Sequence, residues 1–366
     1  MRITAAVARE PHAAFTLEEL ELGPPGPHEI VVENVAAGIC HTDVVVRDQW
    51  FPVPQPIVLG HEGAGLVVEV GAEVTRVAPG DPVVMSMLGC GSCTYCRTGP
   101  PGYCVSHYDL NFGGCRPDGS TALSKGDESI HGHFFSQSSF ATHSIATEYN
   151  VVKIRDDVPL ELMGPLACGV QTGAGAVINS LGVRPGTSIA VFGTGAVGLS
   201  AIMAAKVAGC TTIIGVDIVA DRLQLAESLG ATHTIDATTA DPVEEILSIT
   251  SNGASYSLDT SAVPAVARQA VECLALLGTC GLIGVPPAGT ELTVDFHTVL
   301  FGRFVRGIVG GDAIAQQFIP TLIELWRQGR FPFDRLIRQY DLADINTAVA
   351  DGESGATVKP VLVMPR

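Results

Sequence analysis

The chain has 366 residues, 46% of them hydrophobic, and a formal net charge of −17. This length and composition can fill two hydrophobic cores, so we expect two domains. The acidic excess argues against binding to nucleic acid, which requires clustered lysine and arginine. Apolar runs are short and broken by 41 glycines and 23 prolines, so no segment is expected to span a membrane. Because no apolar block of signal-peptide length stands near residue 1, we expect a cytoplasmic protein.

The first part of the chain, residues 1–169, has the pattern of a mostly β domain. β-branched runs at 30–35, 65–70, 82–85 and 151–154 alternate with glycine and proline. This pattern is typical of short strands joined by turns. We therefore expect an irregular, barrel-like domain.

Residues 170–309 have a different pattern, in which apolar runs alternate with alanine-rich helical stretches. The predicted strands are 188–192, 212–216, 232–235, 256–258, 279–283 and 304–309. This alternation is typical of an α/β domain with a doubly wound parallel sheet. The remaining residues, 310–366, contain an amphipathic pattern at 319–328 and an apolar run at 358–363, and we assign them to the first domain.

Four cysteines are closely spaced: Cys90, Cys93, Cys96 and Cys104. The two-residue gaps allow the thiolates to converge on one tetrahedral zinc ion. Free or disulfide-linked cysteines are the alternative, but this spacing in a cytosolic chain favours a metal. We therefore predict a closed structural zinc site.

Three further candidate ligands, Cys40, His61 and Cys168, are scattered along the sequence. Each alone could be an ordinary core residue. Together, two sulfurs and one imidazole match the protein ligands of a catalytic zinc that keeps one position open. Zinc at such a site would polarise an alcohol oxygen and prepare the alcohol for hydride loss.

A glycine motif follows the predicted strand at 188–192 and precedes a helical stretch. Its glycines are Gly193, Gly195 and Gly198. In this context a G-x-G-x-x-G motif is typical of dinucleotide binding, because the chain turns tightly and a helix N-terminus faces the pyrophosphate.

An acidic residue, Asp217, stands at the end of the next predicted strand. Its carboxylate would accept the ribose hydroxyls and repel a 2′-phosphate, so NAD is favoured over NADP. Arg222 is either a contact to the adenosine ribose or a solvated helix charge, and the sequence supports both equally.

Taken together, these motifs resemble the zinc-containing medium-chain alcohol dehydrogenases over essentially the whole chain. The resemblance is carried by Gly-His-Glu, the four cysteines, Cys168-Gly-Val-Gln-Thr172-Gly, the glycine motif with Asp217, and Gly284-Val-Pro-Pro287. The stretches 109–114 and 132–140 are more similar to bacterial aryl-alcohol (benzyl alcohol) and geraniol dehydrogenases than to ethanol enzymes.

The resemblance implies a GroES-like catalytic domain formed by residues 1–169 and 310–366, and a Rossmann coenzyme domain formed by residues 170–309. It implies two zinc ions per subunit, NAD, and an aryl or allylic primary alcohol as substrate. A glutathione-dependent formaldehyde dehydrogenase of the same family is the alternative. A non-enzymatic relative is disfavoured because the ligand and relay positions all carry suitable residues.

By position in the family's motifs, Cys40, His61 and Cys168 are the catalytic zinc ligands. Glu62 matches a neighbouring carboxylate that can approach the metal. Thr42 matches the hydroxyl that takes the alcohol proton.

The resemblance also implies coenzyme contacts. His41 and Lys359 match residues that face the pyrophosphate, and Thr172 and Val197 match residues that seat the nicotinamide. The family's usual relay histidine is replaced by Val45. The proton therefore leaves either through the ribose hydroxyl and water or through His41, and the sequence does not distinguish these routes.

By their position in the family's sequence, Trp50, Phe51 and Val285 are candidates for the walls of an apolar substrate pocket. Packing of the two aromatic residues in a loop is the alternative. The family associates through the last strands of the coenzyme domain, so residues 303–311 are expected to pair across a two-fold axis. We expect a homo-oligomer, and favour a dimer over a tetramer.

Overall fold

The computed structural model describes residues 1–365 and divides into two compact units. Unit 1 comprises Met1–Cys168, Ile314–Thr321 and Asp334–Arg366, and unit 2 comprises Gly169–Ala313 and Leu322–Phe333. The limits expected from the sequence differ from these chiefly at Leu322–Phe333, which groups with unit 2.

Unit 1 contains two sheets. The first has the strand order β4-β1-β2-β7-β8. Its strands are β1 (Arg2–Ala8), β2 (Thr16–Leu22), β4 (Ile57–Val58), β7 (Leu123–Lys125) and β8 (Glu128–Ile130). The second has the order β10-β6-β5-β3-β18-β17, with β9 also paired to β3. Its strands are β3 (Glu29–Gly38), β5 (Glu62–Val70), β6 (Pro82–Met85), β9 (His143–Thr147), β10 (Val151–Lys153), β17 (Ile337–Asp341) and β18 (Lys359–Val363).

Strand β3 organises the second sheet. It pairs antiparallel with β5, β9 and β18, so segments far apart in sequence meet on it. Ile30, Val31 and Val32 are buried, as expected for β-branched side chains packed between other layers. The mostly β character predicted for this part of the chain is confirmed.

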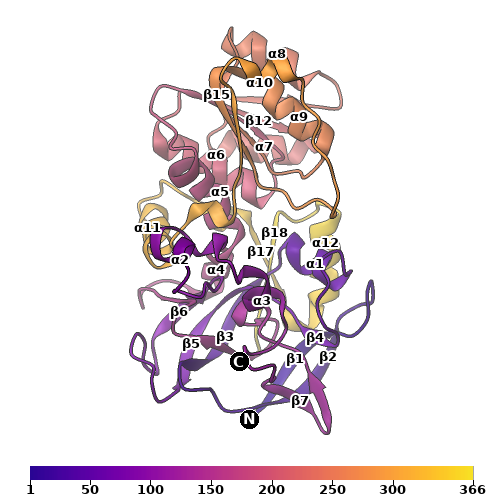
Figure 1. The fold of residues 1–366 in the computed structure, drawn as a ribbon, viewed down its shortest axis with the longest axis vertical. Helices are drawn as coiled ribbons and strands as arrows, with labels where there is room; N and C mark the ends of the chain where they lie inside the picture. The colour runs from indigo at the N-terminus through magenta and orange to yellow at the C-terminus, as the bar shows by residue number, and fades with distance from the viewer. Residues whose placement is uncertain (366) are drawn as a thin grey trace. The chain divides into compact units, whose positions relative to one another are not determined.

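Unit 2 contains a six-stranded sheet in which all pairs are parallel, with the order β13-β12-β11-β14-β15-β16. Its strands are β11 (Ser188–Phe192), β12 (Thr212–Asp217), β13 (His233–Asp236), β14 (Ala254–Asp259), β15 (Leu274–Leu282) and β16 (Phe304–Gly307). Helices α6 to α9 pack against these strands (Figure 1). The predicted doubly wound α/β unit is confirmed.

The α-helices have the following bounds: α1 (His41–Arg47), α2 (Thr94–Thr98), α3 (His107–Phe112), α4 (Leu160–Met163), α5 (Gly169–Gly175), α6 (Ala196–Ala208), α7 (Ala220–Leu229), α8 (Pro242–Thr250), α9 (Pro264–Glu272), α10 (Phe296–Leu300), α11 (Ala315–Arg327) and α12 (Ile345–Glu353). Within residues 1–365, none of the helices has the length and hydropathy needed to cross a membrane.

Candidate metal centres and coenzyme site

Cys40, His61, Glu62 and Cys168 come together in unit 1, where one potential ligand atom from each lies within 4.8 Å of the others. Cys40 is the residue before α1, His61 is the residue before β5, and Glu62 is the first residue of β5. Cys168 follows the 3₁₀ turn Gly164–Ala167. Residues at the ends of three separate elements therefore converge on one point.

A buried carboxylate fixes the orientation of His61. Asp43 Oδ1 lies 2.9 Å from His61 Nδ1 and accepts from the Gly60 amide, while its Oδ2 accepts from the Cys40 amide. His61 Nε2 is buried and has no hydrogen-bond partner. An unpaired imidazole nitrogen beside two sulfurs is the donor set that zinc prefers, so these residues fit the metal that the sequence predicts.

The electrostatics of this group favour one thiolate. Contact with the Cys168 thiol lowers the pKa of Cys40 well below its ordinary value, with help from His61, and the same contact raises the pKa of Cys168. Burial lowers the pKa of His61, but the carboxylate of Asp43 and the Cys40 sulfur outweigh burial and raise it well above its ordinary value. Metal binding at this group must therefore release protons.

Glu62 is paired with Lys359 of β18. The Lys359 ammonium lies 3.0 Å from both carboxylate oxygens and donates to the Ile39 carbonyl at 3.1 Å. Both side chains are buried. Lys359, expected from the resemblance to face the pyrophosphate, thus has acceptors for its ammonium within unit 1.

Thr42 lies beside the same group, with its hydroxyl 3.7 Å from the Cys40 sulfur. Its side chain is half-buried, whereas His41 is exposed at the first position of α1. Val45, on the same helix, is buried in unit 1. A hydroxyl is therefore available for a proton next to the candidate metal centre, with an apolar side chain where a relay histidine would stand.

Cys90, Cys93, Cys96 and Cys104 form a second group in which the sulfur atoms all lie within 4.8 Å of one another. Backbone amides of Cys93, Cys96 and Ser106 donate to sulfurs of this group at 3.3–3.4 Å. The Ser92 hydroxyl and nearby amides lower the pKa of Cys90 to about 6. None of the ten cysteines forms a disulfide in the structure, and four convergent sulfurs fit a tetrahedral zinc ion.

The glycine motif lies between β11 and α6 in unit 2. Gly193 has a φ of +85°, and a Cβ at Gly198 would collide with the Gly193 carbonyl. Both positions therefore require glycine. Val197 is half-buried in α6, and Thr172 is buried in α5.

Asp217 is held rigidly at the end of β12. Its Oδ2 accepts from the amide and hydroxyl of Thr194 at 2.6 and 2.8 Å, and its Oδ1 accepts from the amides of Ile218 and Val219 at 2.8 and 3.0 Å. Thr194 was not predicted from the sequence, although it stands between the first two glycines of the motif. The Nε of Arg222 is buried without a hydrogen-bond partner.

An aromatic cluster surrounds the His61 imidazole in unit 1. Phe135 stacks on it with ring centres 4.5 Å apart, and Phe134 meets it edge-on at 5.5 Å. Phe112 contacts both phenylalanines and stacks on Phe51 at 5.9 Å. Phe51 thus connects to the cluster, whereas Trp50 is half exposed in unit 1 and Val285 is exposed in unit 2.

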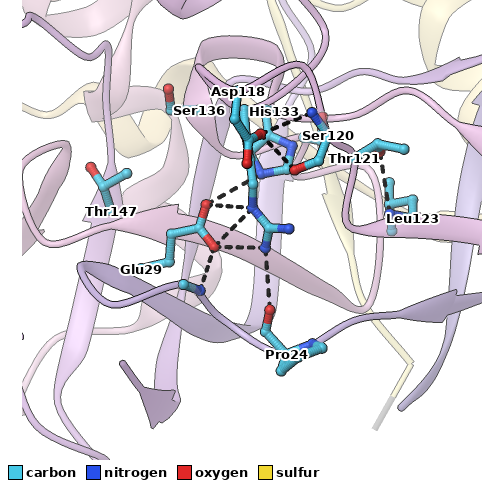
Figure 2. A network of polar contacts seen from close by, with 12 residues as sticks. Pro24, Glu29, Asp118, Ser120, Thr121, Leu123, His133, Ser136 and Thr147 are labelled. Carbon is cyan, nitrogen blue, oxygen red and sulfur yellow. Dashed lines mark hydrogen bonds and ion pairs between the residues drawn. The ribbon is translucent and has the colours of Figure 1, made fainter. Parts of the chain in front are cut away.

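The turn that carries these rings has an unusual backbone. His133 and Phe135 have φ values of 59° and 51°, a left-handed conformation that costs bulky residues free energy and is often found at functional sites. Polar contacts link this turn to β3: Glu29 accepts from the Arg116 guanidinium at 2.7–3.1 Å and lies 3.6 Å from His133. Glu29 and His133 are labelled in Figure 2.

Comparison with known proteins identifies the family. Residues 26–156 match the alcohol dehydrogenase GroES-like domain, and residues 196–327 match the zinc-binding dehydrogenase model. The geraniol dehydrogenase of Castellaniella defragrans is 44% identical over 98% of this chain and 97% of its own length. The chain belongs to the zinc-binding alcohol dehydrogenase family.

Solved structures of this dehydrogenase family have the same fold. The alcohol dehydrogenase zinc-binding domain protein from Burkholderia ambifaria is 51% identical with a TM-score of 0.99. The benzyl alcohol dehydrogenase from Acinetobacter calcoaceticus is 46% identical with a TM-score of 0.97. Both comparisons cover 100% of each chain. The expectation of a zinc-dependent, nucleotide-using alcohol dehydrogenase is confirmed at the level of the family.

Proposed function

We propose that this dehydrogenase transfers a hydride between an aryl or allylic primary alcohol and NAD, giving the aldehyde. The observation that carries the proposal is the convergence of Cys40, His61 and Cys168 beside an aromatic cluster. The names of the relatives, geraniol dehydrogenase and benzyl alcohol dehydrogenase, support the substrate class. We propose the cytoplasm as its location, where thiolate ligands stay reduced.

Unit 1 is the proposed catalytic domain and unit 2 the proposed coenzyme domain. Zinc bound at Cys40, His61 and Cys168 would supply a Lewis acid for the alcohol oxygen. The Thr42 hydroxyl would accept the alcohol proton, and Asp43 keeps His61 in one orientation. Because Val45 cannot carry a proton, the proton would leave through the ribose hydroxyl and water or through His41.

The substrate class can be tested by comparing turnover of benzyl alcohol, geraniol and S-hydroxymethylglutathione with NAD. We expect kcat/KM to be highest for benzyl alcohol or geraniol, since the rings of Phe51, Phe112 and Phe135 form an apolar aromatic cluster beside His61. A clear preference for S-hydroxymethylglutathione would instead favour the formaldehyde dehydrogenase alternative.

The two sulfur-containing groups predict two zinc ions per subunit in protein purified without chelator. Replacing Cys93 with serine should leave one ion and lower the melting temperature, because a structural zinc stabilises the fold directly. Elemental analysis and thermal unfolding measure both effects. Cys115, which belongs to neither group, provides the control Cys115→Ser; a wild-type content of one zinc would contradict the two ligand sets.

The rigid carboxylate of Asp217 predicts a strong preference for NAD. A like-charge contact with a 2′-phosphate costs several kcal/mol, so we expect NAD to be favoured over NADP by about a hundredfold or more. Asp217→Gly should reduce this ratio to near one, as measured by kcat/KM for each coenzyme. Asp221→Ala, which removes a nearby exposed carboxylate, should leave the ratio unchanged; equal use of both coenzymes by the wild type would show that Asp217 does not face the ribose.

The exposed edge of the unit 2 sheet supports the proposed dimer. β16 is the terminal strand, and all four of its residues are exposed, including Phe304 at 62%. Leu277 of β15 is 75% exposed. Apolar surface on an unpaired edge strand is typical of an association site. Light scattering should give a dimer at micromolar concentration and a monomer for Phe304→Glu, and a monomeric wild type would contradict edge pairing.

A further inference from the structure

The side chain of Gln137 links two strands beside the candidate metal centre. Backbone pairing of β5 with β6 ends at Ala64 and Val84. Beyond this last pair, the Gln137 Nε2 group donates to the His61 carbonyl at 3.0 Å and to the Met85 carbonyl at 3.1 Å. A side-chain amide thus continues the connection between the two chains where their backbone ladder stops, at the residue that carries the candidate ligand imidazole.

The same amide also bonds to the chain on the other side of Glu62. The Gln137 Oε1 atom accepts from the Gly63 amide at 3.1 Å, and the whole residue is 1% exposed. A Cβ at Gly63 would collide with the side chains of Met85 and Ser139 and would crowd Oε1, so the glycine leaves the room that this contact needs. Both the donor and the acceptor of the Gln137 side chain are therefore used to hold the start of β5.

Gln137 belongs to the turn formed by residues 133–138, which also supplies the rings around His61. Phe135 stacks on the imidazole with ring centres 4.5 Å apart. Phe135, Ser136 and Ser138 all have φ values between 51° and 52°, and such strained conformations persist only where surrounding contacts fix them. The turn thus holds His61 at two places, its ring through Phe135 and its backbone through Gln137.

We propose that Gln137 is a positioning residue that fixes the backbone of His61 and so keeps the imidazole directed at the candidate metal centre. The inference rests on the proposed assignment of Cys40, His61 and Cys168 as metal ligands. Asp43 orients the ring through Nδ1, whereas Gln137 fixes the chain from which the ring extends. Without the Gln137 amide, three buried backbone groups would each lose a hydrogen-bond partner, and the start of β5 would be free to shift.

The test uses full-length protein loaded with cobalt(II), whose visible absorption bands respond to the number and geometry of the ligands. Gln137→Met keeps the length of the side chain and removes all three hydrogen bonds. We expect changed bands, loss of the metal to a chelator that is about tenfold faster or more, and a lower kcat. Gln137→Glu keeps an acceptor for Gly63, but its carboxylate cannot donate to the His61 carbonyl, so it should also change the bands and speed metal loss. This milder variant decides the question if Gln137→Met does not fold.

Asn34→Ala provides the matched control for a loss of stability alone. Asn34 is another buried amide of unit 1, and it donates instead to the Ala141 carbonyl and the Ser144 hydroxyl. This variant should lower the melting temperature but keep the wild-type bands, metal loss and turnover. Wild-type bands and metal loss in Gln137→Glu, or equal changes in Asn34→Ala, would overturn the positioning role. If Cys40→Ser leaves the bands of the wild type unaltered, the proposed ligand set itself is wrong, which is a different result.

Discussion

Replacing Cys40 with serine should abolish alcohol oxidation, with a loss in kcat of more than about a hundredfold. Removing a residue that only hydrogen-bonds to a metal ligand typically lowers metal affinity or activity by roughly 10–100-fold. Cys40 is itself a proposed ligand, and its contact with Cys168 lowers its pKa. The fold should persist, because the Cys90 group is separate. Steady-state kinetics and circular dichroism measure the two effects.

The matched control for this prediction is Cys115→Ser, which should retain near wild-type turnover. Elemental analysis should find one zinc ion per subunit in Cys40→Ser and two in Cys115→Ser. Retention of both zinc ions and substantial activity in Cys40→Ser would contradict the role of this sulfur.

Replacing Thr42 with alanine should lower kcat by about 10²-fold or more, the range typical of a lost proton-transfer group. The Thr42 hydroxyl lies 3.7 Å from the Cys40 sulfur, and buried Val45 cannot take its place. Thr42→Ser keeps the hydroxyl and should retain most of the activity. Nearly full turnover by Thr42→Ala, with hydride transfer rate-limiting, would remove Thr42 from the proton path.

Two further variants can identify the residue through which the proton leaves after Thr42 has accepted it. Val45→His places an imidazole where the family's relay histidine stands and should shift the pH dependence of oxidation toward neutrality. If His41→Gln changes the pH profile and Val45→His does not, His41 is the exit. The wild-type profile provides the reference for both.

The sequence predicts local features of this dehydrogenase well, since each depends on a short segment. The parallel strands of unit 2 follow from apolar runs, and β11 has the predicted bounds, Ser188–Phe192. The four-cysteine group follows from spacing alone. In each case the physical cause, hydrophobic periodicity or ligand spacing, lies within about twenty residues.

Features that depend on strand register could not be predicted. Glu62 and Lys359 are 297 residues apart, and they meet only because β5 and β18 flank β3 at Gly38. The stacking of Phe135 on His61 depends on a left-handed backbone that bulky residues rarely adopt. Asp43 lies three residues after the candidate ligand Cys40, and Thr194 lies within the glycine motif. Their bonds to His61 and Asp217 nevertheless depend on the three-dimensional arrangement.

The segment that carries the four-cysteine group has few buried residues. Helix α2 within it contains no buried residue, and Tyr95 and Val105 are exposed, so the convergence of four sulfurs substitutes for a hydrophobic core. We therefore expect order in this segment to depend on the proposed structural zinc more than on packing. With a chelator present, we expect a protease to cleave this segment first, while the two sheets of unit 1 stay intact. Cleavage at this one site would then indicate whether the protein in a cell carries zinc at the four-cysteine group.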